Sequence, residues 1–422
     1  MICGDEWREA DQSQRQRSPN QPNGRALRNV HSQLEAPLPA CDLAVAAGNE
    51  KGPALSPTGM PGPLVLYIRD LRGSGVVTNA IALARRMGRE RETILAASYG
   101  KGLNRDVDVF PARLVVLNHA GQPTSRLGEA RRLRALLRQS EAAVAVSMGN
   151  LGHPAFFLAT VGLSVRKIYR ISNEVMRPGK PILNIVRRTW TRICLARADR
   201  VVLVGGALAD LPIFARARAR NLAVYIPNGI DLDRAERLLR EAGECPRNAS
   251  EAVIVTIGRI HPQKNLARLI DALSLANATM PMRLVIVGGG ETADVDRLKR
   301  FAANLGVGDR VEFVGETHNV FAWLKRADLF ALVSLWEGSS TALLEAIAAN
   351  VPVVASRQAG DATCVLDGGR YGALVEANDG EDIAKAILQQ LGPDRIRPGD
   401  RASHYDLRRT HESYSAMFAD LS

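Results

Sequence analysis

The sequence predicts an α/β protein with two doubly wound parallel sheets that face each other across a cleft. Three observations predict it. From residue 63 onward, short apolar segments alternate with amphipathic ones, as strands and covering helices do in a parallel sheet. The alternation stops at Pro227-Asn228-Gly229 and then starts again. A chain of 422 residues also has enough length for two cores. Open α/β sheets bind ligands at the carboxyl ends of their strands, so we expect the ligand in the cleft.

The first half contains the strands and helices of one domain, which we expect to cover residues 61–227. The strand PLVLYIRD begins at residue 63, and a loop with Gly73 and Gly75 leads into the helix VVTNAIALARRM. The later apolar and amphipathic segments are, in order, ETILAAS, ARLVVLN, RLGEARRLRALLRQ, AAVAVS, KIYRIS, ILNIVRRTWTRICLARA and DRVVLVG.

The second half repeats the alternation, and we expect a second domain over residues 228–395. Residues 396–422 end in the amphipathic segment YDLRRTHESYSAMF, which we expect to form a helix packed back on the first domain. Residues 1–60 have no sustained apolar period and are typical of a disordered arm, with Met60 a plausible initiator. The segments of the second domain are AVIVTIGRI, NLARLIDALSLA, MRLVIVGGG, DVDRLKRFAANL, RVEFVGE, NVFAWLKRA, DLFALVS, TALLEAIAAN, VPVVAS, GALVE and DIAKAILQQL.

Composition favours a cytoplasmic protein. The five cysteines lie far apart without a CxxC pair, which indicates reduced thiols and no metal site. The N-terminus has acids near its start and no apolar core, unlike a secretory signal. The uncharged stretch 142–165 is long enough to span a bilayer, but GNLGHP lies at its centre. We therefore predict a buried strand, a loop and a buried helix there.

The net charge of +11 is concentrated in the first domain. Residues 61–227 carry 27 basic and 10 acidic residues, or +17, whereas residues 228–422 carry 22 and 27, or −5. Such a field favours an anionic membrane, a phosphorylated substrate or nucleic acid, or it is a solvated arginine-rich surface. The basic half lacks the aromatic array with which single-strand binders stack bases, so we do not expect nucleic acid as a partner.

Residues 335–346, LWEGSSTALLEA, place two acids around a turn of small residues. We expect the preceding strand to end near Trp336 and a helix to begin near Thr341. Glu337 would then lie in the loop and Glu345 about one turn into the helix. The free amides and the dipole of such a helix start favour a bound anion. The alternative is ordinary capping by a serine of the turn, with Glu345 solvated.

GRIHPQKN follows the strand AVIVTI directly, which puts Arg259 and Lys264 in one loop at a strand end. Two cations there suit a diphosphate, because arginine can bond it in a bidentate fork and lysine adds a point charge. A lysine beside a helix N-terminus is unfavourable unless an anion is present. The alternative is a surface arginine and a first-turn lysine without a ligand.

Other motifs give no support to a nicotinamide or metal cofactor, and we expect neither. The G-x-G of Gly73 and Gly75 lacks the full spacing of a dinucleotide-binding loop and its later acid. Asp-x-Asp pairs begin at Asp106, Asp231 and Asp294, where helix caps and turns explain them.

Several of these motifs together resemble the retaining family-4 glycosyltransferases of the GT-B fold, the glycosyl transferases group 1. The resemblance covers nearly all of residues 63–422 and is strongest in the second domain. It implies two Rossmann-like domains, a UDP- or GDP-sugar donor held by the second and an acceptor held mostly by the first. The acceptor would attack from the face of the leaving group, without an enzyme nucleophile. The motifs are GRIHPQKNLARLIDAL, LVIVGGGE, VEFVGE, LWEGSSTALLEA, PVVAS, YGALVE and IPNGID.

The resemblance implies roles for individual residues. Arg259 and Lys264 would neutralise the donor diphosphate, Glu345 would bond the ribose hydroxyls, and Glu337 would hold the sugar. Gly75 would let the first domain approach the diphosphate. The remaining donor-binding positions are the amides of Gly338, Ser339, Ser340 and Thr341 around the sugar, and Thr317 and Asn319 beside the base.

A histidine of the first domain often lies near the sugar in this family. His153, in SMGNLGHPAFF, is the candidate catalytic histidine and His119 is the alternative, although a structural role is as common for such a residue. Three departures from the family pattern leave the sugar open: Ser339, the segment DATCVL at 361–366, and Val204-Gly205.

We therefore expect a metal-independent hexosyltransferase in the cytoplasm, with a lipid-linked or surface-polysaccharide acceptor and peripheral contact with an anionic membrane. One alternative is a nucleotide-sugar epimerase or hydrolase, which would need acid–base carboxylates in the first domain as well. The other is a non-catalytic protein that binds sugar nucleotides or nucleic acid.

Overall fold

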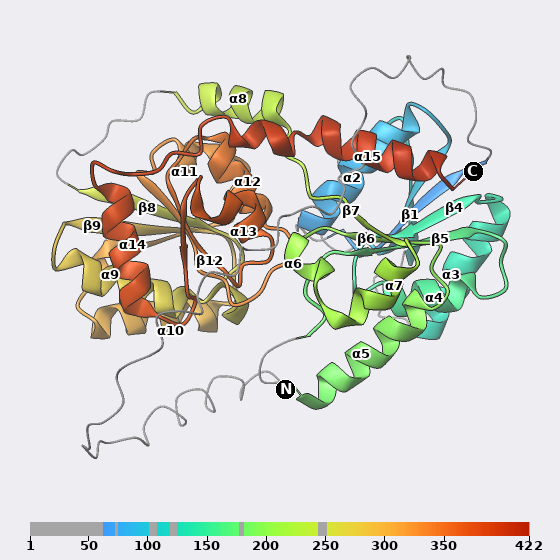
Figure 1. Cartoon of the computed structure of the whole chain (residues 1–422), viewed down its shortest axis with the longest axis horizontal. Helices are drawn as coiled ribbons and strands as arrows, with labels where there is room; N and C mark the ends of the chain where they lie inside the picture. Colours follow the sequence, from blue (N-terminus) through green and yellow to red (C-terminus); the bar gives the residue numbers. More distant parts are fainter. Residues whose placement is uncertain are drawn as a thin grey trace. The chain divides into compact units, whose positions relative to one another are not determined.

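The computed structural model describes residues 62–71, 75–100, 108–118, 125–176, 181–243 and 251–421 (Figure 1). The predicted N-terminal arm lies outside the described residues, as do Gly73, Asp106 and His119. The described residues contain two parallel sheets, one of seven strands and one of six, as the alternating pattern predicts.

Every neighbouring pair of strands is parallel in both sheets. The first sheet contains, from edge to edge, β3 (Arg113–Asn118), β2 (Thr93–Tyr99), β1 (Leu64–Asp70), β4 (Val144–Ser147), β5 (Arg166–Ile171), β6 (Arg200–Leu203) and β7 (Ala223–Tyr225). The second contains β10 (Val311–Gly315), β9 (Met282–Val287), β8 (Ala252–Ile257), β11 (Leu329–Leu332), β12 (Val353–Ser356) and β13 (Ala373–Val375).

Helices connect these strands, and short 3₁₀ turns occur between them. The helices of the first half are α2 (Gly75–Gly88), α3 (Arg126–Gln139), α4 (His153–Thr160), α5 (Pro181–Leu195), α6 (Gly206–Ala209) and α7 (Ala215–Ala219). Those of the second half are α8 (Leu232–Glu241), α9 (Leu266–Asn277), α10 (Thr292–Asn304), α11 (Phe321–Leu324), α12 (Thr341–Ala348), α13 (Ala362–Val365), α14 (Gly380–Leu391) and α15 (Leu407–Ala419).

The strands are apolar because both faces of each sheet are covered. Along β1, Leu64 and Leu66 enter one buried cluster while Val65 and Tyr67 enter another. Since successive side chains of a strand point to opposite faces, two separate clusters mean that helices cover both sides. β9 alternates in the same way between two clusters of the second sheet. The observed burial explains why the strands read as continuous apolar runs.

The order of strands reverses once in each sheet, between β1 and β4 in the first and between β8 and β11 in the second. At such a switch point the connections leave toward opposite faces of the sheet, which opens a crevice beyond the strand ends. The chain that follows β8 and the chain that follows β11 therefore lie next to each other.

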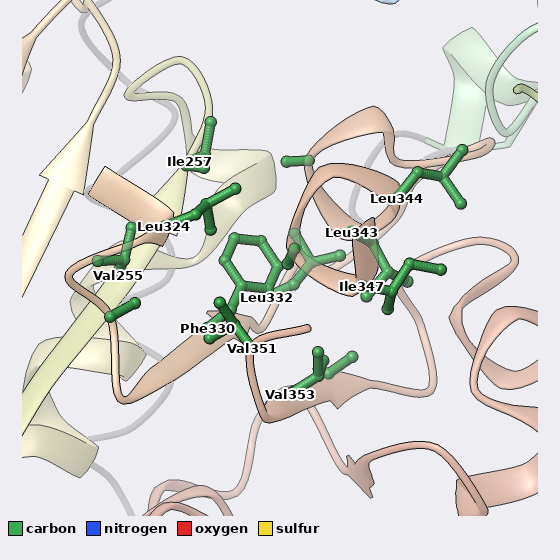
Figure 2. Close-up of a cluster of buried hydrophobic side chains, with 14 of the residues drawn as sticks. Val255, Ile257, Leu324, Phe330, Leu332, Leu343, Leu344, Ile347, Val351 and Val353 are labelled. Atoms are coloured by element: carbon green, nitrogen blue, oxygen red, sulfur yellow. The ribbon is translucent and has the colours of Figure 1, made fainter. Parts of the chain in front are cut away.

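A buried cluster fixes the start of α12 behind this crevice (Figure 2). Phe330 and Leu332 of β11 and Leu343 and Ile347 of α12 all belong to it, and Phe330 is fully buried. The side chains point toward one another in Figure 2. Burial of this size stabilises by roughly 2 kcal/mol per side chain, so the strand and the helix on either side of the loop 333–340 are held firmly.

The C-terminal helix α15 completes the core of the first sheet. Tyr414, Met417 and Phe418 belong to the same buried cluster as Leu83 and Met87 of α2. Phe418 is fully buried, and the ring of Tyr414 packs on it with 6.0 Å between centroids.

Two local predictions need comment. The strand expected to run to Trp336 ends at Leu332. Its continuation is diverted because the Leu335 amide donates to the Gln263 carbonyl at 2.8 Å. The stretch 142–165 contains β4 and α4, as predicted. Within the described ranges, no helix is both long and apolar enough to span a bilayer.

Candidate functional site

Two loops at the β8/β11 switch point are joined by hydrogen bonds. The Gln263 side chain donates to the Trp336 carbonyl at 2.7 Å, in addition to the bond between Leu335 and the Gln263 carbonyl. The strands themselves pair, with Leu329 opposite Ile254. The residues of GRIHPQK and of LWEGSST, which are far apart in the sequence, therefore form one site.

Lys264 and Glu337 form an ion pair at the centre of this site. The Lys264 Nζ lies 2.7 Å from Glu337 Oε1, and the two side chains are 18 % and 12 % exposed. The Ser334 hydroxyl donates to the same oxygen at 3.1 Å. The expectation that Lys264 needs a bound anion is therefore revised, because Glu337 already supplies a negative charge.

Gly258 makes room for the lysine. Its φ of +148° is one that side-chain-bearing residues rarely adopt, and a Cβ there would lie 2.6 Å from Lys264 Cε. Asn265, with φ of +54°, turns the chain into α9 and donates from its amide to the Ala377 carbonyl at 2.7 Å. The backbone of the loop thus holds the lysine stem in one place.

Arg259 directly follows the strand end and is exposed. Within the described part of the chain it has no acidic partner. The loop therefore offers one cation that is already paired and one that is open to a ligand.

The N-terminus of α12 lies on the other side of the ion pair. The helix begins at Thr341, as predicted, and its N-cap Ser340 makes no side-chain capping bond. The first amides of the helix therefore have no cap from this side chain, and the Ser340 amide faces the Asp361 carboxyl. Serine capping, the alternative drawn from the sequence, does not occur.

Three segments of the first sheet come close to the loop 337–341. A Cβ on Gly75 would lie 3.2 Å from Thr341 Cγ2, and one on Gly205 would lie 2.3 Å from the Gly338 carbonyl oxygen. A Cβ on Gly338 would lie 2.2 Å from the Ser172 carbonyl oxygen. The last two positions accept only glycine, because the obstacle is backbone.

Glu345 lies in the second turn of α12 and is partly buried. Burial raises its pKa to about 7, although the positive charges of Arg234 and Lys264 act in the opposite direction. Arg234, at the start of α8, is a neighbour that the sequence motifs do not indicate.

Asp361 is a second buried acid that sequence reasoning missed. It follows β12, is 1 % exposed, and neither carboxylate oxygen has a hydrogen-bond partner among the described residues. The Ser339 hydroxyl and the backbone amides of Ser340 and of Asp361 itself face it. Burial raises its pKa to about 7, these three donors oppose the shift, and the charge of Glu337 adds to it. The only signal in the sequence is the departure from the family pattern at DATCVL.

A polar chain from the first sheet also reaches this loop. Arg170 is 2 % exposed and donates to the Met148 carbonyl at 3.0 Å and to the Asn228 side chain. Asn228 in turn donates to the Ser339 carbonyl at 3.1 Å. Neither residue stands out in the sequence, because their contact spans 58 positions.

Thr317 and Asn319 lie outside this cluster. They follow β10, which β9 separates from β8. The Asn319 side-chain nitrogen donates to the Leu238 carbonyl at 3.4 Å, and the Asn319 side-chain oxygen accepts from the Phe321 backbone amide at 3.0 Å. The Thr317 hydroxyl accepts from the Asn319 amide at 3.3 Å. These hydrogen bonds of the two side chains stabilise the turn and its contact with α8.

We expected His153 in a loop, but it is the first residue of α4. It is 6 % exposed, its Nδ1 lies 2.8 Å from the Ser147 hydroxyl, and its ring meets Tyr169 edge-on at 5.2 Å. Burial and then the charge of Arg170 lower its pKa to about 3. The ring is therefore neutral near pH 7, and its Nε2 is buried without a partner among the described residues.

The acidic pairs outside the site have local structural roles. Asp231 caps α8 by accepting from the Arg234 amide, and Asp294 bonds Arg297 at 2.7 Å within α10. Asp108 accepts from the Phe110 amide at 2.9 Å. Among the described residues there is no group of three or more histidine, cysteine or acidic side chains that could hold a metal ion.

The two doubly wound parallel sheets have the GT-B fold. A solved structure of the Anabaena protein HepE with UDP and glucose has a TM-score of 0.69 to this chain. It is 18 % identical and covers 85 % of this chain and 99 % of its own length, so the likeness shows the fold.

Residues 251–392 match the family model described as Glycosyl transferases group 1. A D-inositol 3-phosphate glycosyltransferase of Catenulispora acidiphila is 34 % identical over 209 residues, 46 % of this chain and 48 % of the relative. The Escherichia coli UDP-Gal:alpha-D-GlcNAc-diphosphoundecaprenol alpha-1,3-galactosyltransferase is 29 % identical over 208 residues, 48 % of this chain and 51 % of the relative. The chain spans about half the length of the curated relatives it matches.

Proposed function

We propose that the protein is a retaining glycosyltransferase that moves a hexose from a UDP- or GDP-sugar to a lipid-linked or surface-polysaccharide acceptor. The observation that carries the proposal is the cluster of Arg259, the Lys264–Glu337 pair and the uncapped start of α12 at one switch point. The family supports the reaction class. The name of the E. coli relative specifies a UDP-sugar and a lipid-linked acceptor, which supports the choice of substrates.

The cations and the helix start would stabilise the leaving group. As the bond between sugar and diphosphate breaks, negative charge grows on the departing oxygen, and preorganised positive groups lower the barrier. Arg259 is open to bond a phosphate in a bidentate fork. Lys264 has three N–H donors and uses one for Glu337, so it can bond a phosphate without giving up the ion pair.

Glu337 would hold the sugar and not attack it. One of its oxygens already accepts from Lys264 and Ser334, which leaves the other for a sugar hydroxyl. In the retaining mechanism we propose, the acceptor hydroxyl attacks from the face that the diphosphate leaves. The remaining donor contacts are assigned to the amides of Gly338–Thr341 for the sugar, Glu345 for the ribose, Thr317 and Asn319 for the base, and Gly75 for the diphosphate.

His153 would act as a neutral hydrogen-bonding group. With a pKa of about 3 it does not carry a proton near pH 7, so we assign it a role through its unpartnered Nε2. We further propose that residues 61–227 form the acceptor domain and residues 228–395 the donor domain, with residues 396–422 returning to the first.

The test uses the full chain with UDP- and GDP-sugars and a lipid-linked or oligosaccharide acceptor. We expect a new glycoside whose anomeric configuration matches the donor, by NMR of the product. An altered sugar nucleotide would identify an epimerase, a free sugar would identify a hydrolase, and nucleotide binding without any product would identify a binding protein. An inverted linkage would contradict the retaining mechanism alone.

We also propose that α5 carries the peripheral contact with an anionic membrane. Of the residues in this helix only Cys194 is buried. Its apolar residues face solvent, with Ile182 77 % and Ile185 66 % exposed. Residues 181–197 contain four arginines and no acid. An exposed apolar stripe beside basic side chains fits the interface of a membrane with anionic lipids. The further apolar residues of this surface are Leu183, Val186, Trp190 and Ile193.

Exchange of Ile182 and Ile185 for aspartate is expected to weaken binding to vesicles that contain phosphatidylglycerol at least tenfold. The change removes apolar contact and adds negative charge near an anionic surface, where each basic residue is worth about 1 kcal/mol. Flotation with and without anionic lipid measures it. The matched control is Leu275→Asp on α9, which is 47 % exposed and lies in the second half. Equal binding of both variants and the wild type would contradict the assignment to α5.

A further inference from the structure

The carboxyl group of Asp361 is buried beside the loop 337–340. It is 1 % exposed, and both of its oxygens lack a hydrogen-bond partner among the described residues. The Ser339 hydroxyl beside it is also buried without a partner. A buried polar group without a partner costs free energy, and such groups persist mainly where function requires them. Asp361 and Ser339 lie side by side, so one ligand group could bond both.

The carboxyl group lies against the loop that would hold the sugar. Gly360, with φ of +66°, brings the chain so close that a Cβ there would lie 2.5 Å from the Gly338 carbonyl oxygen. From the other side, a Cβ on Gly205 would lie 3.5 Å from Asp361 Cβ. Asp361 is therefore enclosed by the loop 337–340 and by the turn that follows β6.

We propose that Asp361 is a specificity-determining residue that bonds a ring hydroxyl of the donated sugar, with the Ser339 hydroxyl as a second contact. The inference rests on the proposed function and adds the polar group that selects which sugar is donated. Glu337 has one oxygen left for a sugar hydroxyl, because Lys264 and Ser334 bond the other, so a second acid can contact a further hydroxyl. A hydroxyl fits better than an ammonium group, since a hydroxyl can bond a carboxyl group in either protonation state.

The test compares a donor with its monodeoxy analogues on the wild type and on Asp361→Ala. A site built to bond a hydroxyl strongly rejects the analogue that lacks it, because its own polar group is left unpaired. On the wild type we expect one deoxy position to lower kcat/KM at least about 100-fold. On Asp361→Ala the kcat/KM values of the same analogue and of the parent donor should differ by less than about threefold. Asp361→Asn, which keeps the shape and one acceptor, is expected to fall between them.

A second readout separates this role from a structural one. We expect Asp361→Ala to melt at or above the wild-type temperature without ligand, because it removes an unpartnered group. Binding of the nucleoside diphosphate alone should stay within about twofold, because Asp361 would contact only the sugar. Lower melting temperatures together with lost diphosphate binding would overturn the inference in favour of a structural role.

The remaining outcomes are also distinct. The wild type could transfer sugar while each deoxy analogue lowers kcat/KM by the same factor on the wild type and on Asp361→Ala. The inference would then be wrong and the proposed function would stand. If the wild type neither binds nor uses any nucleotide sugar, the proposed function fails and takes this inference with it.

Discussion

Lys264→Ala is expected to lower the rate of sugar transfer about 100- to 1000-fold, the loss that follows removal of one preorganised donor from a developing anion. The affinity for the nucleoside diphosphate should fall less, by roughly 10- to 100-fold, as for one hydrogen bond to a charged group. Lys264 lies 2.7 Å from Glu337 and is 18 % exposed, so water replaces it poorly. Steady-state kinetics and calorimetric titration of UDP and GDP measure the two effects separately.

The variant also leaves Glu337 without its cation, and controls must separate that effect. Glu337 is 12 % exposed and would keep only Ser334 as a partner. Breaking one half of a buried pair destabilises more than removing both halves. Lys264→Ala combined with Glu337→Gln should therefore melt higher than Lys264→Ala alone, while its transfer rate stays low. The matched charge control is Lys299→Ala, an exposed lysine of α10, for which we expect near wild-type rates.

If Lys264→Ala retained its rate while Arg259→Ala lost it, the diphosphate would depend on Arg259 alone. The Lys264–Glu337 pair would then be a structural bridge between the two loops.

The stability difference between Asp361→Asn and the wild type is expected to grow as pH rises from about 4 to 7. The pKa of Asp361 is about 7 in the folded protein and 3.8 in an exposed chain. Between these values the unfolded chain loses the proton and the folded protein keeps it. The wild type therefore loses stability from this group with each unit of rising pH, and Asp361→Asn does not. Glu345, with a pKa of about 7, contributes a smaller loss of the same sign between about pH 4.5 and 7.

The pH curve of the wild type alone cannot show this effect. Burial lowers the pKa of His153 to about 3 and that of His411 to about 4. A buried histidine with a lowered pKa contributes its full stability to the folded protein above the ordinary histidine pKa of 6.5. That contribution is lost as pH falls below 6.5. The histidines and the acids therefore oppose each other over the same range.

The measurement is thermal or urea unfolding of matched variants at pH 4, 5, 6, 7 and 8. The free energy of unfolding of Asp361→Asn should rise relative to that of the wild type toward high pH. That of His153→Gln should rise relative to the wild type toward low pH. A parallel offset of Asp361→Asn at every pH would mean that the Asp361 carboxyl titrates normally, contrary to its complete burial.

The sheets and the start of α12 could be predicted because local patterns encode them. Covered strands such as β1 must be apolar on both faces, and the helix start at Thr341 follows a turn of small residues. The pairing of Lys264 with Glu337 could not be predicted from either motif alone, because the residues are 73 positions apart and meet only through strand order. The domain boundaries at 227/228 and 395/396 remain predictions.

Burial is the property that sequence reasoning judged least well. In the sequence His153 and Asp361 resemble many polar loop residues, yet both side chains are buried from solvent. Their burial depends on Tyr169 in one case and on Gly205 and Gly338 in the other, which are contributed by distant segments. The end of β11 at Leu332 has the same origin, since the bonds of Gln263 turn the chain there.

The packing of α15 into the core of the first sheet has a consequence for synthesis on the ribosome. Leu64 to Ile226 emerge first, but Tyr414, Met417 and Phe418 belong to the same cluster and emerge after nearly half of the chain more has been made. At about 5–20 residues per second, the chain between Ile226 and Tyr414 takes on the order of 10–40 s to make, and the apolar surface of α2 stays uncovered throughout that time. The first-made half therefore reaches its final packing last, and a ribosome that stalls late releases a chain with an open, aggregation-prone face.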